Sequence, residues 1–144
     1  MKIAVRYHSR GGNTKKLAQA IARAVGVQAL DCSSPITEPV DLLFFGGSMY
    51  GFDLDDTTKG YIAKLNPDLV KTAAVFGTSA IVKNGNEEMA KLLTEKKIPV
   101  LEKRFYCRGA FTLMHKGRPN EDDLKKAAEF ASEISSTFLL SNTL

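Results

Sequence analysis

The sequence predicts an α/β fold in which helices cover both faces of a doubly wound, five-stranded parallel sheet, giving three layers. Apolar β-runs alternate with amphipathic helical segments along the chain, which is the pattern of βαβ units. The run 41–45 is apolar after its first residue, as expected of a strand buried on both faces. A glycine-rich turn joins the first strand directly to the first helix. The 144 residues suffice for one domain with a sizeable core, so we expect a single domain over 1–144.

The N-terminal half of the chain supplies three of the strands. Leu17, Ile21 and Val25 recur at helical spacing after the first strand, and Gly26 is a suitable stop. Asn66-Pro67 ends the second helix, because the residue before a proline disfavours helical geometry. The expected elements are strands at 2–7, 27–30 and 41–45, and helices at 13–25 and 55–65.

The C-terminal half supplies the two remaining strands. We expect a strand at 72–77, a helix at 86–97 and a strand that starts near 100 and extends towards 107. The stretch 108–119 fits a continued strand, a turn or an open loop. Asn120 is a suitable N-cap for a last helix, and the acidic residues 121–123 place negative charge at the positive end of its dipole.

The turn after the first strand has the composition of a phosphate-binding loop. Helix N-termini present N–H groups that have no partner within the helix, and the helix dipole adds positive potential there. Glycines let the backbone approach a ligand, and short hydroxyls add hydrogen bonds. The spacing excludes a Walker A loop, which ends in Gly-Lys-Ser/Thr, and a dinucleotide fingerprint, which needs a third glycine. The residues of this candidate site are Ser9, Arg10, Gly11, Gly12, Asn13 and Thr14.

The loop resembles the phosphate loop of flavodoxins, Thr/Ser-x-Thr-Gly-Asn-Thr, which wraps the 5′-phosphate of FMN. Gly11 departs from that pattern, because the family usually has a threonine there, and Arg10 could supply a compensating cation. The resemblance implies a sheet of order 2-1-3-4-5, with FMN at the switch point between the first and third strands. An ordinary strand-to-helix turn without a ligand is the alternative.

The segment after the third strand is suited to a flat aromatic ligand. Tyr50 and Phe52 offer rings for stacking, and Gly51 permits a change of peptide orientation. In flavodoxins the corresponding loop flanks the isoalloxazine, and a residue-Gly peptide there turns to meet the flavin N5. The resemblance therefore assigns Ser48, Met49, Tyr50, Gly51 and Phe52 to the cofactor site. Packing of the two rings against the second helix, or in a subunit contact, is the alternative.

The segment after the fourth strand corresponds to the flavodoxin loop that touches the pyrimidine edge of the flavin. By resemblance Thr78, Ser79 and Ala80 bind that edge. The family often has a stacking aromatic here, and the run 77–85 has none. An open outer face would favour reaction with small acceptors.

Three functions remain open at this point. The first is an FMN protein that carries electrons to a redox partner protein or a small-molecule acceptor. It needs no catalytic residue of its own, because the flavin does the chemistry. The second is an FMN-dependent reductase of quinones or similar acceptors that oxidises NADH or NADPH. The third is a flavodoxin-fold binding module that has lost FMN.

The charge and composition of the chain narrow the classes of partner that we expect. The net charge of +4 departs from the acidic flavodoxins, and fits either an acidic partner or lineage alone. The basic pairs are scattered without interleaved aromatics, so we expect solvated helix faces and no nucleic-acid site. No apolar run is long enough for a membrane span, so we expect no membrane contact. We expect a monomer or homodimer in the cytoplasm.

The two cysteines fit a reducing compartment. Cys32 and Cys107 form no CxxC pair, and His8 and His115 are isolated, so we expect no metal site. Both thiols are expected to be structural.

Overall fold

The computed structural model describes residues 1–50, 53–79, 85–109 and 117–143; for residues 49, 50, 53, 85 and 141–143 it describes the backbone. The described strands form one sheet with the order β2-β1-β3-β5-β6. All neighbours in this order pair in parallel, which confirms the predicted order 2-1-3-4-5 with β5 and β6 as the fourth and fifth strands. The strands are β1 (Ile3–Tyr7), β2 (Ala29–Asp31), β3 (Leu42–Tyr50), β5 (Ala73–Ser79) and β6 (Phe105–Arg108).

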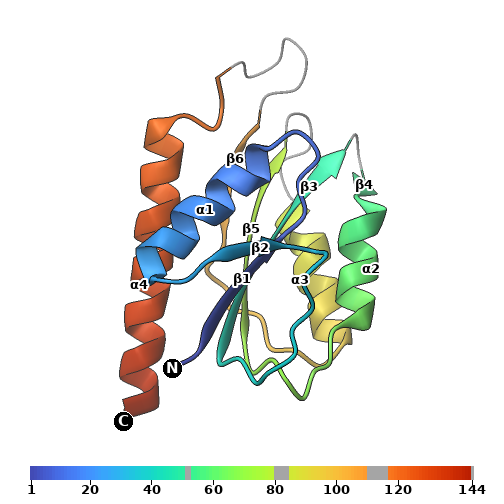
Figure 1. The fold of residues 1–144 in the computed structure, drawn as a ribbon, viewed down its shortest axis with the longest axis vertical. Coiled ribbons are helices and arrows are strands. Elements are labelled where there is room, and N and C mark those ends of the chain that lie inside the picture. The colour runs from blue at the N-terminus through green and yellow to red at the C-terminus, as the bar shows by residue number, and fades with distance from the viewer. Residues whose placement is uncertain (51–52, 80–84, 110–116, 144) are drawn as a thin grey trace.

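Helices cover both faces of this sheet (Figure 1). α1 (Asn13–Val25) and α4 (Glu121–Thr143) lie on one side, and α2 (Asp56–Lys64) and α3 (Gly85–Glu95) lie on the other. Each side has its own apolar core. Leu17, Ile21 and Phe130 are among the buried residues under α1 and α4. Ile62 and Leu93 are among those under α2 and α3. The three predicted layers are therefore confirmed.

The third strand is longer than the sequence predicted. Expected at 41–45 with a loop after Gly47, β3 continues to Tyr50, and Met49 and Tyr50 pair antiparallel with a short β4 (Asp53–Leu54). Gly46 and Gly47 lie inside the strand rather than at its end. A Cβ on Gly46 would lie 2.1 Å from Cε2 of Phe76, so the absent side chain leaves room for that buried ring.

The other predicted helices and strands are present with shifted ends. β6 begins at Phe105 rather than near 100, because Val100 makes only an isolated bridge to Ala73. β2 begins two residues later and ends one residue later than expected, and β5 begins one residue later and ends two residues later. α3 ends at Glu95, and Lys97 has a φ of 69° that ends helical geometry. Asn120 caps the start of α4, as the sequence predicted. The N–H of Asp123 donates to the Asn120 side chain, and the N–H of Asn120 donates to the Asp123 carboxylate.

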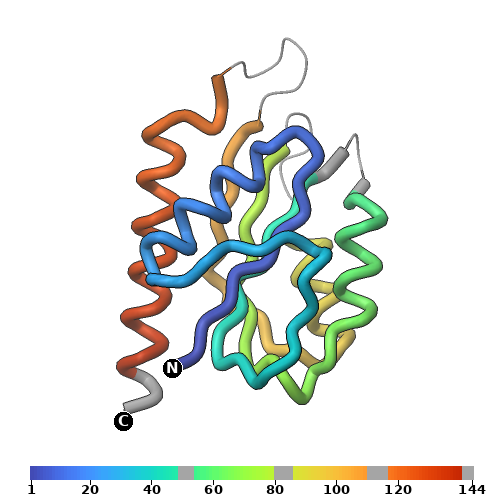
Figure 2. The backbone as a smooth tube through the Cα atoms, in the orientation of Figure 1, coloured from blue at the N-terminus to red at the C-terminus, as the bar shows by residue number. Residues whose placement is uncertain are grey.

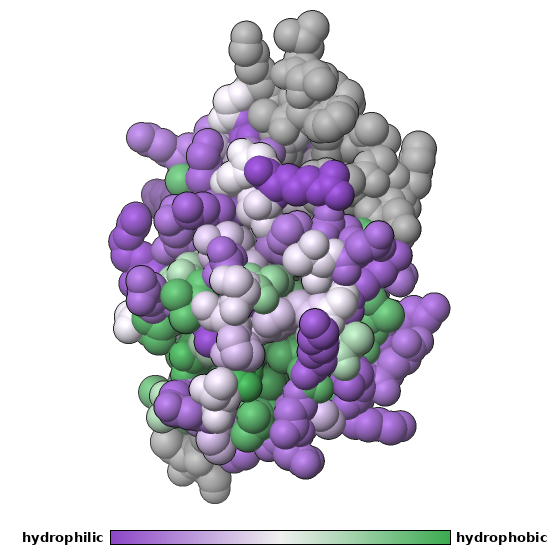
Figure 3. Space-filling view, turned by 45° about the vertical axis from the view of Figure 1, so that its right-hand side comes forward, coloured by the Kyte–Doolittle hydropathy of each residue, from purple (hydrophilic) through white to green (hydrophobic). Residues whose placement is uncertain are grey.

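The face of the molecule drawn in Figure 3 is largely polar. Figure 3 shows hydrophilic side chains spread over the visible face, with apolar side chains gathered in its lower half. Within the described residues, every helix is too short or too polar to cross a bilayer.

Candidate functional site

The turn from β1 into α1 has the backbone of an anion-binding loop. Gly12 adopts a φ of 91°, and its N–H donates to Oγ of Ser9 over 3.0 Å. The first helical hydrogen bond runs from the N–H of Lys16 to the carbonyl of Gly12 over 3.1 Å. A Cβ on Gly11 or Gly12 would meet nothing within 4 Å, so the space in front of the loop is open on the described side. Figure 2 traces this turn at the end of the sheet where the parallel strands end.

Three buried hydroxyls gather behind this loop. Oγ1 of Thr14 lies 2.5 Å from Oγ of Ser48 and 3.0 Å from Oγ1 of Thr78, and the latter two atoms are 3.2 Å apart. All three residues are buried. The sequence placed Ser48 and Thr78 in loops, but they lie in β3 and β5, where they are paired neighbours in register. The register therefore brings both hydroxyls to the start of α1.

The hydroxyl cluster is polar and can supply hydrogen-bond donors to an anion. Each hydroxyl has one donor hydrogen and turns about its C–O bond, so these donors can point to an anion without moving a side chain. Thr78, which the resemblance assigned to the flavin edge, contacts Thr14 at the start of α1. It brings a third hydroxyl to a loop whose Gly11 has none.

Asp55 connects the loop to the start of α2. Its Oδ1 lies 3.1 Å from Nε2 of His8, and its Oδ2 lies 2.8 Å from a guanidinium nitrogen of Arg10. The same carboxylate caps α2, because it accepts a hydrogen bond from the N–H of Thr57 over 2.8 Å. Burial raises the pKa of this carboxyl, but the Thr57 hydrogen bond and the attraction of His8 and Arg10 outweigh it, so the Asp55 pKa lies below its ordinary value.

The structure therefore gives Arg10 and His8 a partner other than a phosphate. Arg10 was considered as a compensating cation for the phosphate. Both side chains instead contact Asp55, whose side chain is only 2% exposed. Among Asp53, Asp55 and Asp56, it is Asp55 that caps α2.

Gly109, just after β6, and Gly77, in β5, let neighbouring groups approach the backbone closely. A Cβ on Gly109, just after β6, would lie 2.9 Å from Nδ2 of Asn13, so the end of β6 packs against the predicted site residue. A Cβ on Gly77 would lie 2.9 Å from Oδ1 of Asn86, which is buried at the start of α3. Side chains at these positions would push the loop or α3 away from the sheet.

One predicted site residue has a buried polar atom without a protein partner. Oγ of Ser79 is buried at the end of β5 and makes no hydrogen bond. The same is true of two other buried atoms, Oγ1 of Thr58 and Oδ1 of Asn86. An unpaired buried hydroxyl costs free energy, which a hydrogen bond to a ligand or water removes. Ser79 therefore agrees with a ligand-facing position.

The remaining predicted site residues lie partly outside the described residues. Met49 and Tyr50 are described as backbone of β3. Gly51, Phe52 and Ala80 lie outside the described residues.

Sequence reasoning overlooked two relationships in this site. It did not place Thr78 beside Thr14, because the strand was expected to end at 77. It did not connect Asp55 with His8 and Arg10, although an acidic cap after one strand and basic residues after another pointed to the same sheet edge.

Comparison with known proteins decides the family. The model of the flavodoxin domain matches residues 4–114. The chain belongs to the flavodoxin domain family. Its relatives include an uncharacterized protein of Methanocaldococcus jannaschii that is 31% identical over 149 residues, covering 93% of this chain and 98% of the relative.

Solved structures agree with this flavodoxin fold. A flavodoxin from the domain Archaea matches with a TM-score of 0.79 and 18% identity, covering 96% of this chain and 99% of that one. Flavodoxin 2 from Bacillus cereus matches with a TM-score of 0.71 and 17% identity, over 95% and 99% of the two chains. Rubredoxin:oxygen oxidoreductase from Desulfovibrio gigas matches at 0.79 and 13% identity, with 99% of this chain covering 37% of that chain.

Proposed function

We propose that this flavodoxin domain binds FMN and serves as an electron carrier. The observation that supports the proposal best is the hydroxyl cluster of Thr14, Ser48 and Thr78 behind a glycine loop at a helix N-terminus. It offers donors to an anion at the end of the sheet where doubly wound folds bind their ligands.

The phosphate subsite would be formed by the first loop and the hydroxyl cluster. The N-terminal turn of α1 supplies N–H groups and positive dipole potential. Asp55 holds the side chains of His8 and Arg10 beside α2, and so fixes the strand end from which the loop departs. The proposed phosphate contacts are Ser9, Arg10, Gly11, Gly12, Asn13, Thr14, Ser48 and Thr78, with Arg10 contributing backbone.

The ring subsite would be formed by the ends of β3 and β5. We propose that Met49, Tyr50, Gly51 and Phe52 flank the isoalloxazine. Ser79 and Ala80 would bind its edge, and the unpaired Oγ of Ser79 supports this role. FMN supplies the redox chemistry, and the chain supplies anchoring, orientation and electrostatics.

A binding module without FMN is the second candidate, and one contact favours it. The guanidinium of Arg10 is paired with Asp55 at 2.8 Å, so the cation that would offset the absent threonine at position 11 is already neutralised. Thr78 argues against this candidate, because it restores a third hydroxyl to the site.

Flavin titration of the purified protein tests the proposal. An electron carrier is expected to quench FMN fluorescence at micromolar concentration or below, and to oxidise neither NADH nor NADPH unless a reductase is added. Turnover of NADH or NADPH by the protein alone would favour the reductase instead. Absence of FMN binding would favour the binding module.

A further inference from the structure

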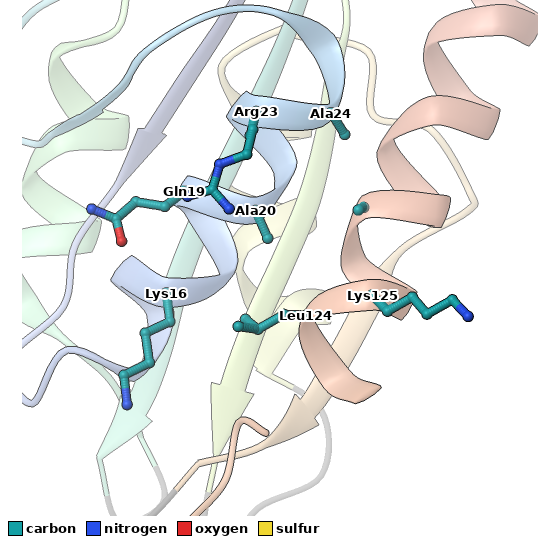
Figure 4. A pocket seen from close by; sticks show the side chains of 8 residues that line it. Lys16, Gln19, Ala20, Arg23, Ala24, Leu124 and Lys125 are labelled. Atoms are coloured by element: carbon teal, nitrogen blue, oxygen red, sulfur yellow. The ribbon is translucent and has the colours of Figure 1, made fainter. Parts of the chain in front are cut away.

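A groove runs between α1 and α4 on the outer surface of one helical layer (Figure 4). Its volume is about 390 Å³. The floor is formed by Ala20 and Ala24 of α1 and by Leu124 and Ala128 of α4. Because an alanine side chain ends at Cβ, the two helices leave a depression here that larger side chains would fill.

Cationic side chains stand on both sides of this apolar floor. Lys16 and Arg23 lie on α1, two turns apart on one helix face, and Lys125 lies on α4. All three are exposed, and none makes an ion pair with a described residue. The neighbouring Lys126, in contrast, pairs with Asp122 over 3.0 Å. The cations of the groove therefore keep their charge available for an external anion.

α4 carries five carboxylates, of which those of Asp122, Asp123 and Glu133 already pair with basic residues outside the groove lining. α1 contains no aspartate or glutamate. On α4, Glu121 and Glu129 lie one turn before and after Lys125, but neither is within ion-pair distance of it in the described chain. Lys16 also lies near the positive end of the α1 dipole, a placement that is unfavourable for a cation in an isolated helix. Local helix stability therefore does not account for a lysine there.

We propose that this groove docks an acidic amphipathic segment of a partner protein. An apolar side chain of that segment would rest on the alanine floor, and its carboxylates would face Lys16, Arg23 and Lys125. The net charge of +4 steers a negatively charged protein towards the chain over a longer range. This inference concerns the outer face of α1 and α4, and does not depend on FMN binding.

The residues of the groove floor favour a protein partner over a nucleic acid. Single-stranded nucleic acids combine phosphate contacts with stacking on aromatic side chains. The residues that line this groove include no aromatic ring, and small apolar residues suit an aliphatic side chain instead.

The test compares two charge-matched double variants of the full chain. Arg23→Gln/Lys125→Gln removes two cations from the groove. Lys64→Gln/Lys91→Gln removes two exposed cations from α2 and α3, in the opposite helical layer. Circular dichroism verifies that both variants fold.

The probe is a synthetic acidic helix made of three Leu-Glu-Glu-Ala-Leu-Glu-Glu repeats, titrated at low salt. The groove variant is expected to bind it about fivefold more weakly, from the loss of two exposed charge contacts, and the control variant like the wild type. Backbone NMR shifts of the wild type are expected to concentrate on α1 and α4.

Absence of binding, equal weakening in both variants, or shifts spread over other elements would overturn the proposal. So would tighter binding of a DNA duplex through the same residues. A dimer of the free protein that dissociates in Arg23→Gln/Lys125→Gln would likewise overturn it, because a second copy would then occupy the groove.

Discussion

The buried carboxylate of Asp55 lies 3.1 Å from Nε2 of His8, which connects the cap of α2 to the end of β1. One residue thus begins a helix and fixes the strand end from which the glycine loop departs. β1 lies within the sheet and α2 covers one of its faces, and no short-range sequence pattern joins them. This relationship makes the geometry of the loop sensitive to the charge at position 55.

Replacing Asp55 separates its two roles. Asparagine caps helices about as well as aspartate, so Asp55→Asn removes the charge and retains the cap. We expect a loss of about 1 kcal/mol in the free energy of unfolding for Asp55→Asn, and about 1 kcal/mol more for Asp55→Ala. Urea unfolding at neutral pH measures both values.

The pH dependence of Asp55→Asn gives an independent check. The folded pKa of Asp55 lies below its ordinary value of 3.8, so its stabilisation is complete above that value and is lost as pH falls through the folded pKa. The difference between wild type and Asp55→Asn should therefore shrink only in acid. A difference that stays constant down to acid unfolding would show that the charge of Asp55 does not stabilise the loop.

Thr78 should contribute to phosphate binding rather than to ring binding. Thr78→Val keeps the shape and removes one hydroxyl of the buried cluster. We expect a loss of about 1 kcal/mol in stability and roughly tenfold in FMN affinity, with riboflavin affinity unchanged. Isothermal titration with the two flavins measures the difference.

Ser79→Ala is the matched control for that variant. Because Oγ of Ser79 is buried without a partner, its removal should leave the free protein equally stable or slightly more stable. Its proposed contact is with the ring, so the affinities for FMN and riboflavin should fall together. If Thr78→Val also weakened both flavins equally, Thr78 would belong to the ring subsite.

Two glycine substitutions should change stability in opposite directions. In Gly46→Ala the new Cβ would lie 2.1 Å from the buried ring of Phe76, and such overpacking costs about 1–3 kcal/mol. In Gly60→Ala, inside α2, the new Cβ meets nothing within 4 Å, so helix propensity should raise stability by about 0.5–1 kcal/mol. A Gly46→Ala variant that unfolds at the same temperature as the wild type would contradict this packing.

Both cysteines should be unreactive in the folded protein. Burial raises the pKa of Cys32 and of Cys107 to about 12. At pH 8 only about one thiol in ten thousand is then the reactive thiolate. Ellman's reagent should react slowly with the native protein and quickly in denaturant, and rapid native labelling would show that a thiol is accessible and ionised.

The sequence predicted the layers, the strand order and α1 with its bounds, because alternating β-runs and helical faces carry that information locally. It did not predict that β3 extends to Tyr50. Gly46 and Gly47 read as a strand end, whereas in the fold they admit Phe76 and Met89 from other elements. Such close approach is a tertiary requirement that a local pattern does not contain.

The candidate site was predictable as separate loops but not as a cluster. Ser9, Gly12 and Thr14 stood out because their spacing matches a loop that closes locally. The contact of Thr14 with Ser48 and Thr78 depends on the parallel register of β3 and β5, which is set by packing across the whole sheet. The local sequence therefore identified the loop, and the register of the sheet adds the two further hydroxyls of the site.

The ratio of FMN to riboflavin affinity tests the central claim most directly. The two flavins share the isoalloxazine and differ in the phosphate, so fluorescence quenching by the wild-type protein isolates the phosphate subsite. A site made of the α1 start and three buried hydroxyls should bind FMN at least about a hundredfold more tightly than riboflavin, as expected from several charge-assisted hydrogen bonds. Equal affinities, or no binding of either flavin, would contradict the assignment of a phosphate site to the loop and its hydroxyl cluster.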